Sequence, residues 1–361
     1  SSRTSVFFPQ RIQCFIRLAK RYSKGVLRIK MTSKTSERYS EWRSLGQVLV
    51  DSTGRWLSAS IFGGSSNGAS CIVIDSQDLS TTDIGDLVGE ELSVFGWSNL
   101  GSELIVGASP ARDDAVTLKA ISLVSSVSVR PLGPTEPLMI YSAAFGNRGI
   151  FAIIEDSTSE NGGAAGLCLV QFENEGAKGK ILLQLPTAVE SAIRLAPDEK
   201  HILLRVYYNH SNCERIVTLN LDNGNVSYFG NETPDQEVDA YWLPEAGRFF
   251  LFTKCQGIST SRVIDLNNGS EGVMEAVDLF APEHCYIQPG TSVAVLTRFC
   301  KGKIESAVFD ISRKLLTRWP DSGDEMLPVC PSPDGRWFVK VGRPNALPSL
   351  GLMAVTDPQS F

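Results

Sequence analysis

The sequence predicts an all-β chain, a seven-bladed β-propeller of four-stranded antiparallel blades, because one pattern recurs at regular intervals. Seven times in 361 residues a polar turn is followed by a run in which apolar and polar side chains alternate, as they do in half-buried strands. Successive copies lie 47, 47, 51, 48, 43 and 45 residues apart, which is the length of one propeller blade. The reference residues of the turns are Gly54, Gly101, Arg148, Glu199, Gly247, Gly290 and Gly335.

Each copy has the same internal order of expected strands. One strand enters the reference turn, a second leaves it, and a third follows after a loop, for example at residues 71–75, 215–221 and 261–266. Turns rich in Asn and Gly come next, as at residues 222–225 and 265–269. Because Asn and Gly tolerate positive φ, these turns predict hairpins into a fourth, outer strand.

The turn sequences carry a resemblance to a known repeat family. Residues 332–335 read Ser-Pro-Asp-Gly and are followed by Arg-Trp-Phe-Val, while residues 196–199 form a degenerate copy. This pattern resembles the turn of WD40 and TolB-like (PD40-type) propeller repeats. The copies lack the Gly-His and Trp-Asp pairs of WD40 repeats, so the TolB-like type is the closer match. The resemblance covers about residue 47 to the C-terminus and implies a fold but little chemistry.

The expected organisation is one propeller over residues 37–361, preceded by a basic segment at residues 1–36. The seventh copy ends after three strands, so an outer strand is missing from it. A strand at residues 25–30 has the alternation to fill that place and to join the two ends of the ring, which would leave no exposed sheet edge there. Residues 40–45 are the alternative for this closing strand.

The first 36 residues differ in charge from the rest. They contain nine Lys or Arg residues and no Asp or Glu, which leaves 25 basic against 40 acidic residues in the body. An Arg-rich segment mixed with Phe and Ile resembles a mitochondrial targeting sequence. It also fits a basic arm for RNA or an anionic membrane. Because Met31 resembles a start site, a third interpretation is that residues 1–30 are not part of the mature protein.

These features lead to an intracellular location, cytoplasmic, or mitochondrial if the leader is genuine. The acidic body makes the ring a poor nucleic-acid binder, since phosphate contacts need clustered Lys and Arg. No apolar run is long enough to span a bilayer. The eight cysteines include no Cys-x-x-Cys pair, which favours a reducing compartment.

Motifs for catalysis, metals or cofactors are weak, and we predict no catalytic residue, no metal site and no cofactor. Residues 64–68 match the Gly-x-Ser-x-Gly pattern, but they lie between two expected strands, whereas a nucleophile elbow needs a strand followed by a helix. The three histidines, His201, His210 and His284, have no metal-ligand spacing. Residues 265–271 superficially match a calcium loop and are expected to be a hairpin turn.

The expected binding region is the axial channel of the ring, lined by the inner strands. Positions five or six residues before the reference residues contain a cluster of Arg, His and aromatic side chains, which are frequent at binding hot spots. A slip of one residue exchanges the two faces of a strand. The alternative is that the aromatic side chains pack between blades and that the arginine pairs with an acid. The candidate residues are Arg194, Tyr241, Trp242 and His284 at these positions, and Tyr286, which lies four residues before Gly290.

Two classes of function follow. The first is a non-catalytic scaffold that presents loops and faces to protein partners, as a subunit or assembly factor of a larger complex. The second is an enzyme-associated propeller. It would be either a small-molecule enzyme that uses the channel or the gating propeller of a prolyl-oligopeptidase-like serine hydrolase.

Overall fold

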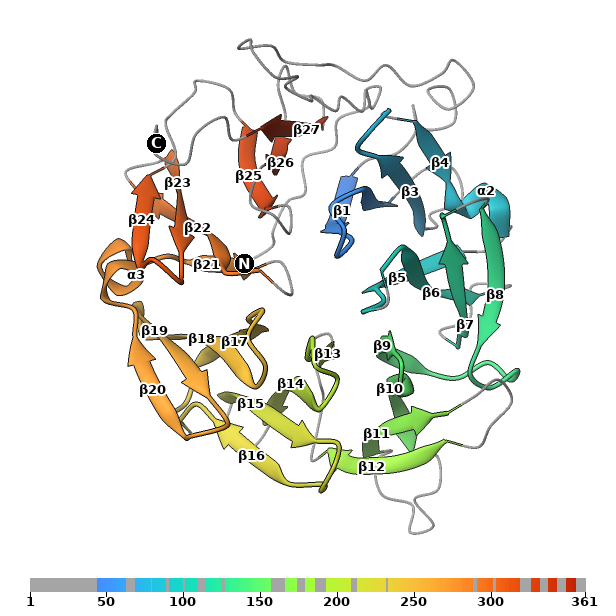
Figure 1. Cartoon of the computed structure of the whole chain (residues 1–361), viewed down its shortest axis with the longest axis horizontal. Coiled ribbons are helices and arrows are strands. Elements are labelled where there is room, and N and C mark those ends of the chain that lie inside the picture. The colour runs from blue at the N-terminus through green and yellow to red at the C-terminus, as the bar shows by residue number, and fades with distance from the viewer. Residues whose placement is uncertain are drawn as a thin grey trace, which may run out of the picture.

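The computed structural model consists of antiparallel sheets arranged in a ring (Figure 1). Six sheets of four strands and one of three are found among the described residues. The structure describes residues 44–62, 69–78, 80–88, 91–99, 101–109, 115–124, 127–156, 166–173, 179–185, 193–208, 213–231, 233–287, 291–300, 303–318, 326–331, 337–342 and 349–354.

The first three sheets are built from twelve strands. They are β1 (Ser44–Val50), β2 (Trp56–Phe62), β3 (Ala69–Asp75) and β4 (Thr81–Asp83); β5 (Glu91–Trp97), β6 (Glu103–Ser109), β7 (Thr117–Ser122) and β8 (Ser128–Leu132); and β9 (Ile140–Gly146), β10 (Gly149–Asp156), β11 (Gly166–Phe172) and β12 (Lys180–Leu185). A short helix, α2 (Ile84–Val88), joins the first sheet to the second.

Fifteen further strands form the remaining sheets. They are β13 (Arg194–Leu195), β14 (His201–Tyr208), β15 (Cys213–Asn220) and β16 (Val226–Phe229); β17 (Glu237–Trp242), β18 (Arg248–Cys255), β19 (Ile258–Asp265) and β20 (Ser270–Val273); β21 (His284–Ile287), β22 (Val293–Cys300), β23 (Lys303–Asp310) and β24 (Leu315–Arg318); and β25 (Met326–Pro331), β26 (Trp337–Gly342) and β27 (Ser349–Ala354). Helix α3 (Glu275–Phe280) joins β20 to β21.

The strands of every sheet follow one another in chain order, and each pairs antiparallel with the next. The first strand of each sheet is its inner edge and the last is its outer edge, as Figure 1 shows. Strand β1 lies against both β5 and β25, so the first and last sheets are neighbours in the ring. The repeat predicted from the sequence is therefore confirmed as a propeller of four-stranded blades.

The prediction of seven four-stranded blades is met by six sheets only, because β25, β26 and β27 form a sheet of three. The closing strand expected at residues 25–30 lies outside the described residues. The alternative at residues 40–45 is wrong for its last two residues. Ser44 and Leu45 belong to β1, which pairs with β2 at the inner edge of the first sheet.

Three of the reference turns share one geometry, which fits the sequence period. Gly54, Gly101 and Glu199 each donate a backbone hydrogen bond to the carbonyl oxygen three residues earlier, and all three have positive φ. Only glycine adopts this conformation without a steric cost. Glu199, with φ of 54°, keeps the turn of its neighbours without being glycine.

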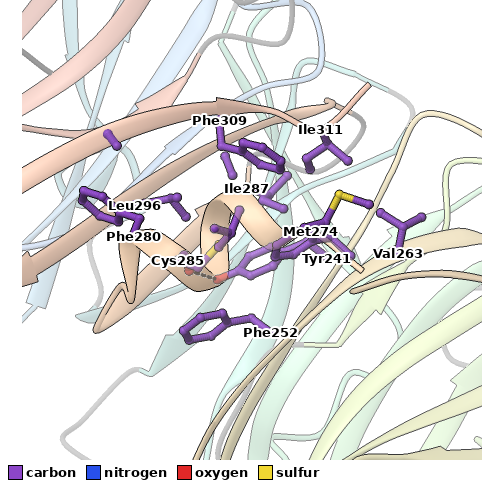
Figure 2. Close-up of a cluster of buried hydrophobic side chains, with 14 of the residues drawn as sticks. Tyr241, Phe252, Val263, Met274, Phe280, Cys285, Ile287, Leu296, Phe309 and Ile311 are labelled. Carbon is purple, nitrogen blue, oxygen red and sulfur yellow. Dashed lines mark hydrogen bonds between the residues drawn. The ribbon is translucent and has the colours of Figure 1, made fainter. Parts of the chain in front are cut away.

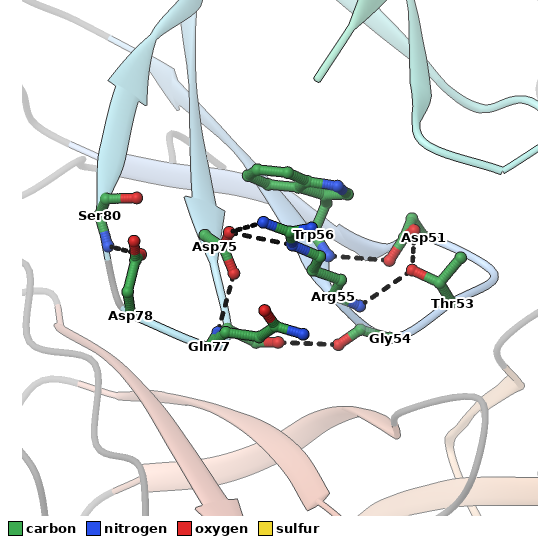
Figure 3. Close-up of polar contacts among 10 residues, drawn as sticks. Asp51, Thr53, Gly54, Arg55, Trp56, Asp75, Gln77, Asp78 and Ser80 are labelled. Carbon is green, nitrogen blue, oxygen red and sulfur yellow. Dashed lines mark hydrogen bonds and ion pairs between the residues drawn. The ribbon is translucent and has the colours of Figure 1, made fainter. Parts of the chain in front are cut away.

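A polar cluster at the first reference turn joins that turn to the end of the third strand (Figure 3). Buried Asp51 accepts the backbone N–H of Trp56 at 2.8 Å. The Nε and Nη2 atoms of Arg55 donate to Asp75 Oδ2 at 3.0 and 2.8 Å, and Asp75 Oδ1 accepts the backbone N–H of Gln77 at 2.8 Å. Asp75, at the end of the third strand, thus binds both the reference turn, through Arg55, and the turn that follows, through Gln77.

The hydrophobic core is divided into clusters, each of which lies between two consecutive sheets. Figure 2 shows the cluster between the β17–β20 and β21–β24 sheets, which α3 covers at its outer side. Phe252, Phe280 and Phe309 are among its buried members. Because each blade packs on both sides, the middle strands are apolar on both faces, as at Phe249–Phe252, where all four residues are buried.

Several expectations for loops can be compared with the structure. Residues 265–269 form the predicted hairpin turn between β19 and β20, in which Gly269 has φ of 69°. The Gly-x-Ser-x-Gly segment at residues 64–68, the Ser-Pro-Asp-Gly turn at 332–335, His210 and the basic segment 1–36 lie outside the described residues. No described helix is long and apolar enough to cross a membrane.

Candidate functional site

Three of the candidate residues occupy equivalent positions on neighbouring inner strands. Arg194 on β13 pairs with Leu203, Tyr241 on β17 pairs with Phe250, and Tyr286 on β21 pairs with Val295. In each sheet the partner is the third residue of the second strand, so the three side chains lie at one level around the axis of the ring.

The three side chains contact one another in sequence. The guanidinium carbon of Arg194 lies 4.0 Å from the centre of the Tyr241 ring. The Tyr241 and Tyr286 rings meet edge to face, with 5.9 Å between their centroids. A cation over a ring face and an edge-to-face ring pair are both favourable arrangements, so a continuous stack joins three blades at their inner edges.

Asp239 completes this cluster, and sequence reasoning missed it. It lies two residues before Tyr241 on β17 and therefore on the same face of the strand. Its Oδ1 atom accepts from Nη1 of Arg194 at 2.5 Å and from the backbone N–H of Ala240 at 2.9 Å. Its Oδ2 atom accepts the Tyr241 hydroxyl at 2.6 Å. The period-two spacing of Asp239 and Tyr241 was the signal that could have revealed it.

Arg194 is held in a charged state by this arrangement. Burial lowers the pKa of its guanidinium, but the charge and hydrogen bond of Asp239, together with the interactions with Tyr241 and Tyr286, outweigh burial and raise the pKa. Nη1 also donates to the carbonyl oxygen of Ala240. The side chains of Arg194 and Asp239 are 20% and 23% exposed, so the pair is accessible to solvent at one side only.

Tyr241 is the buried centre of the cluster. Its hydroxyl contacts Asp239 and also lies 3.0 Å from the carbonyl oxygen of Cys285. Figure 2 marks the contact with Cys285. Burial, together with the charge of Asp239, raises the pKa of this phenol well above its ordinary value. Burial also raises the pKa of the Cys285 thiol. Tyr241 therefore stays neutral and acts as a hydrogen-bond donor.

Trp242 lies on the opposite face of β17 from Tyr241. Its Nε1 atom donates to the carbonyl oxygen of Arg194 at 2.7 Å, and its ring meets Phe249 edge to face at 5.6 Å. The side chain is only 1% exposed. Trp242 therefore packs between blades, as the alternative interpretation expected. Arg194 pairs with an acid, Asp239, which the same alternative also expected.

Counting five residues back from Glu199 and from Gly247 places Trp242, rather than Tyr241, level with Arg194. The structure shows that this register is wrong by one residue. The reason lies in the turn. Leu243 donates to the carbonyl oxygen of Arg248 as Ala196 does to that of His201, so the two turns close over the same length. The glycine of the fifth turn, Gly247, comes one position later in it than Glu199 does in the fourth.

His284 lies at the next level, together with Asp239. His284 pairs with Thr297 and Asp239 with Phe252, which are the fifth residues of their second strands. Ser93 pairs with Gly107 at the corresponding position of the β5–β8 sheet. Ser93 and His284 are exposed, and Tyr286 is partly exposed. These inner-strand side chains are therefore available to a molecule at the axis.

The inner edges of the earlier sheets carry small or aliphatic residues at the level of Arg194. They are Leu49, Gly96 and Ala144, which pair with the third residues of their second strands. A Cβ atom added at Gly96 would meet no atom within 4 Å. The polar stack is therefore confined to one part of the ring.

The chemistry that this cluster supports is binding and orientation. Arg194 offers a positive charge, Tyr286 offers an aromatic surface, and His284 offers an imidazole. Among the described residues, no group of three His, Cys, Asp or Glu side chains is placed to hold a metal ion. His201 packs near Trp242, with 6.0 Å between ring centroids, and contacts the Asn220 amide, so its partly buried ring packs within the blades.

Comparison with known proteins reveals similarity at the level of structure. No protein-family model and no curated protein sequence matches the chain. An oligogalacturonate lyase solved with manganese is 13% identical, with a TM-score of 0.61 over 87% of this chain and 89% of the lyase. Puromycin hydrolase is 13% identical, with a TM-score of 0.62 over 89% of this chain and 55% of that protein.

A third similar structure is prolyl oligopeptidase B from Galerina marginata. It is 11% identical, with a TM-score of 0.60, and the match covers 89% of this chain and 50% of the peptidase. The chain thus spans about half the length of the two hydrolases. Similarity at this level of identity shows the propeller fold alone.

These comparisons correct the expected function. A non-catalytic interaction scaffold was the first expectation, but the similar structures are those of a lyase and two hydrolases. They favour the enzyme-associated alternative. The sequence repeat misled because it encodes strands and turns, which are common to propellers of every function.

Proposed function

We propose that this chain is the substrate-admitting propeller of a prolyl-oligopeptidase-like serine hydrolase, and that its ring has seven blades, with β25, β26 and β27 as the last. In this function the ring selects small substrates, and they approach the catalytic site along its axis. The observation that carries the proposal is the stack of Arg194, Tyr241 and Tyr286 on adjacent inner edges, with exposed His284 and Ser93 one level away.

The stack suits a selective passage for two reasons. First, its side chains are fixed by contacts between blades, because Asp239 binds both Arg194 and Tyr241. A fixed wall discriminates between substrates better than a mobile one, since less order is lost on binding. Second, Arg194 and Tyr286 remain partly exposed, so they can contact a peptide without moving. The similarity to puromycin hydrolase and prolyl oligopeptidase B supports amide substrates.

The test is to obstruct the axis in the intact natural protein. Ser93→Trp places a large side chain at an exposed position on the inner strand β5. Val129→Trp is the matched control, because Val129 is 41% exposed on β8, the outer strand of the same sheet. We expect the first variant to lower kcat/KM for an octapeptide by about tenfold, a barrier change of ~1.4 kcal/mol, while the control does not. Equal kcat/KM in both variants would contradict an axial route.

A second candidate is a small-molecule enzyme that works at the axis itself. It is favoured by exposed His284, which lies on the same strand face as Tyr286 and is the kind of residue that acts as a general base. The nearly complete match to the lyase, 89% of its length, agrees with this candidate. His284→Ala separates the two, because it abolishes turnover only if the chemistry occurs at the axis.

A further inference from the structure

Among the residues that the structure describes, the guanidinium of Arg194 has acceptors along one edge only. An arginine has five N–H donors. Those of Nη1 point to Asp239 and to the carbonyl oxygen of Ala240. No described residue accepts from Nε or Nη2, and neither atom is among the buried polar atoms that lack a partner. Because 20% of the side chain is exposed, we take the Nε–Nη2 edge as the part of Arg194 that is open to an acceptor.

The free edge is held in place by its surroundings. Asp239 fixes Nη1, and the Tyr241 ring lies under the guanidinium plane at 4.0 Å. Asp239 in turn accepts from Arg194, Ala240 and Tyr241, so its carboxylate has little capacity left for a cation. The cluster therefore offers solvent an oriented pair of donors, and little ordering is needed when an acceptor binds.

The chemistry of that edge selects the acceptor. The parallel N–H bonds of Nε and Nη2 match the two oxygens of a carboxylate, which binds them bidentately. Because Asp239 already offsets the charge of Arg194, a singly charged carboxylate fits better than a phosphate dianion. Tyr286, partly exposed beside Tyr241, provides an apolar surface for the remainder of the ligand.

We infer that Arg194 binds a carboxylate of the peptide substrate as it passes along the axis. This inference rests on the proposed function. The carboxylate is either the C-terminus of a short peptide or an Asp or Glu side chain. The ring would thereby favour peptides that carry such a group over neutral peptides of the same length.

Binding of four matched peptides to the intact protein tests the inference by calorimetry. Acetyl-tetra-alanine is compared with its C-terminal amide. Acetyl-Ala-Glu-Ala-Ala-amide is compared with the peptide that has Gln in place of Glu. We expect one or both carboxylate forms to bind at least about tenfold more tightly than the neutral forms, as a charge-assisted pair predicts. The first pair reports on C-terminal carboxylates and the second on acidic side chains.

Variants connect the preference to Arg194. Arg194→Gln should abolish it, and Arg194→Lys, which keeps the charge but loses the two-pronged edge, should reduce it. Asp239→Asn should increase affinity for the carboxylate forms, because it removes a nearby negative charge. Arg262→Gln is the control, since Arg262 on β19 forms an exposed pair with Glu271 far from the inner strands. Circular dichroism verifies that each variant is folded.

The result that overturns the inference is an equal affinity for carboxylate and neutral peptides, or a preference that persists in Arg194→Gln. Amide hydrolysis by the same preparations is measured separately. If hydrolysis is present without the carboxylate preference, the inference fails and the proposed function stands. If the preference depends on Arg194 but no amide hydrolysis occurs, the hydrolase assignment fails.

Discussion

The guanidinium of Arg194 lies 4.0 Å above the Tyr241 ring, although the two residues belong to different blades. Asp239 binds both of them. This contact combines a structural role with an accessible charge, because Tyr241 is buried while Arg194 is partly exposed. At this contact the residues that pack between two blades also lie at the inner edges of the ring, and the proposed function depends on it.

Asp239→Ala should destabilise the fold. It removes the acceptor of Arg194 and Tyr241, leaving a partly buried charge and a buried hydroxyl with one partner fewer. We expect a loss of about 2–4 kcal/mol in the free energy of unfolding, measured by urea denaturation. The control is Glu271→Ala, whose pair with Arg262 is about half exposed on both sides and should contribute no more than ~0.5 kcal/mol. Equal effects of the two substitutions would contradict the structural role of Asp239.

Two glycines in central strands should respond differently to alanine. A Cβ at Gly107 would lie 2.8 Å from Phe95 and 2.9 Å from Val116, so Gly107→Ala should cost about 1–3 kcal/mol through overpacking. At Gly166 an added Cβ meets nothing within 4 Å, so Gly166→Ala should be neutral or stabilise by ~0.5 kcal/mol. Thermal denaturation of both variants measures the contrast.

Alkylation should divide the cysteines by burial. Cys71 is fully buried, and burial raises the pKa of its thiol to about 12, which leaves almost no reactive thiolate at neutral pH. Cys255 and Cys300 are only partly buried. Mass spectrometry after brief iodoacetamide treatment should find Cys255 and Cys300 modified first and Cys71 only after unfolding. Early modification of Cys71 would show that the β2–β3 pairing opens readily.

Acidification should destabilise the protein through His201. Burial lowers the pKa of His201 below its ordinary value, although Asp198 and Asp222 partly oppose this. The unfolded chain therefore binds a proton below about pH 6.5 while the folded chain does not, so stability falls as pH decreases from there. His201→Gln should remove this part of the pH dependence. Unfolding curves between pH 5 and 7.5 that remain parallel for the two proteins would contradict the assignment.

The repeat and the strand order could be predicted because each blade carries its own turn signal. Gly54 and Gly101 take positive φ in the reference turns, as their residue type allows, and the Asn-rich turn after Asp265 leads to an outer strand as expected. The register of the inner strands could not be predicted. Gly247 sits one place later in its turn than Glu199 does, and glycine spacing alone does not reveal such a shift.

The sequence could predict only some members of the candidate site. Arg194, Tyr241 and Tyr286 were selected as unusual residues near the inner edges, and the structure brings them together. Asp239 was missed because an acid is common in this acidic chain; only its spacing of two residues from Tyr241 on β17 indicates that both lie on the same face. Trp242 is a candidate by its position and because aromatic side chains are frequent at binding hot spots, but its large apolar ring is buried in the core.

Labelling with an activity-based probe will show whether this propeller serves a serine hydrolase. The protein is isolated intact from its native source and treated with a fluorophosphonate, and the labelled polypeptide is identified by mass spectrometry. We expect a labelled serine in the polypeptide or stable complex that contains this chain, with labelling slowed by short peptides. No labelling in a preparation that contains the chain, alongside a labelled control hydrolase, would contradict it.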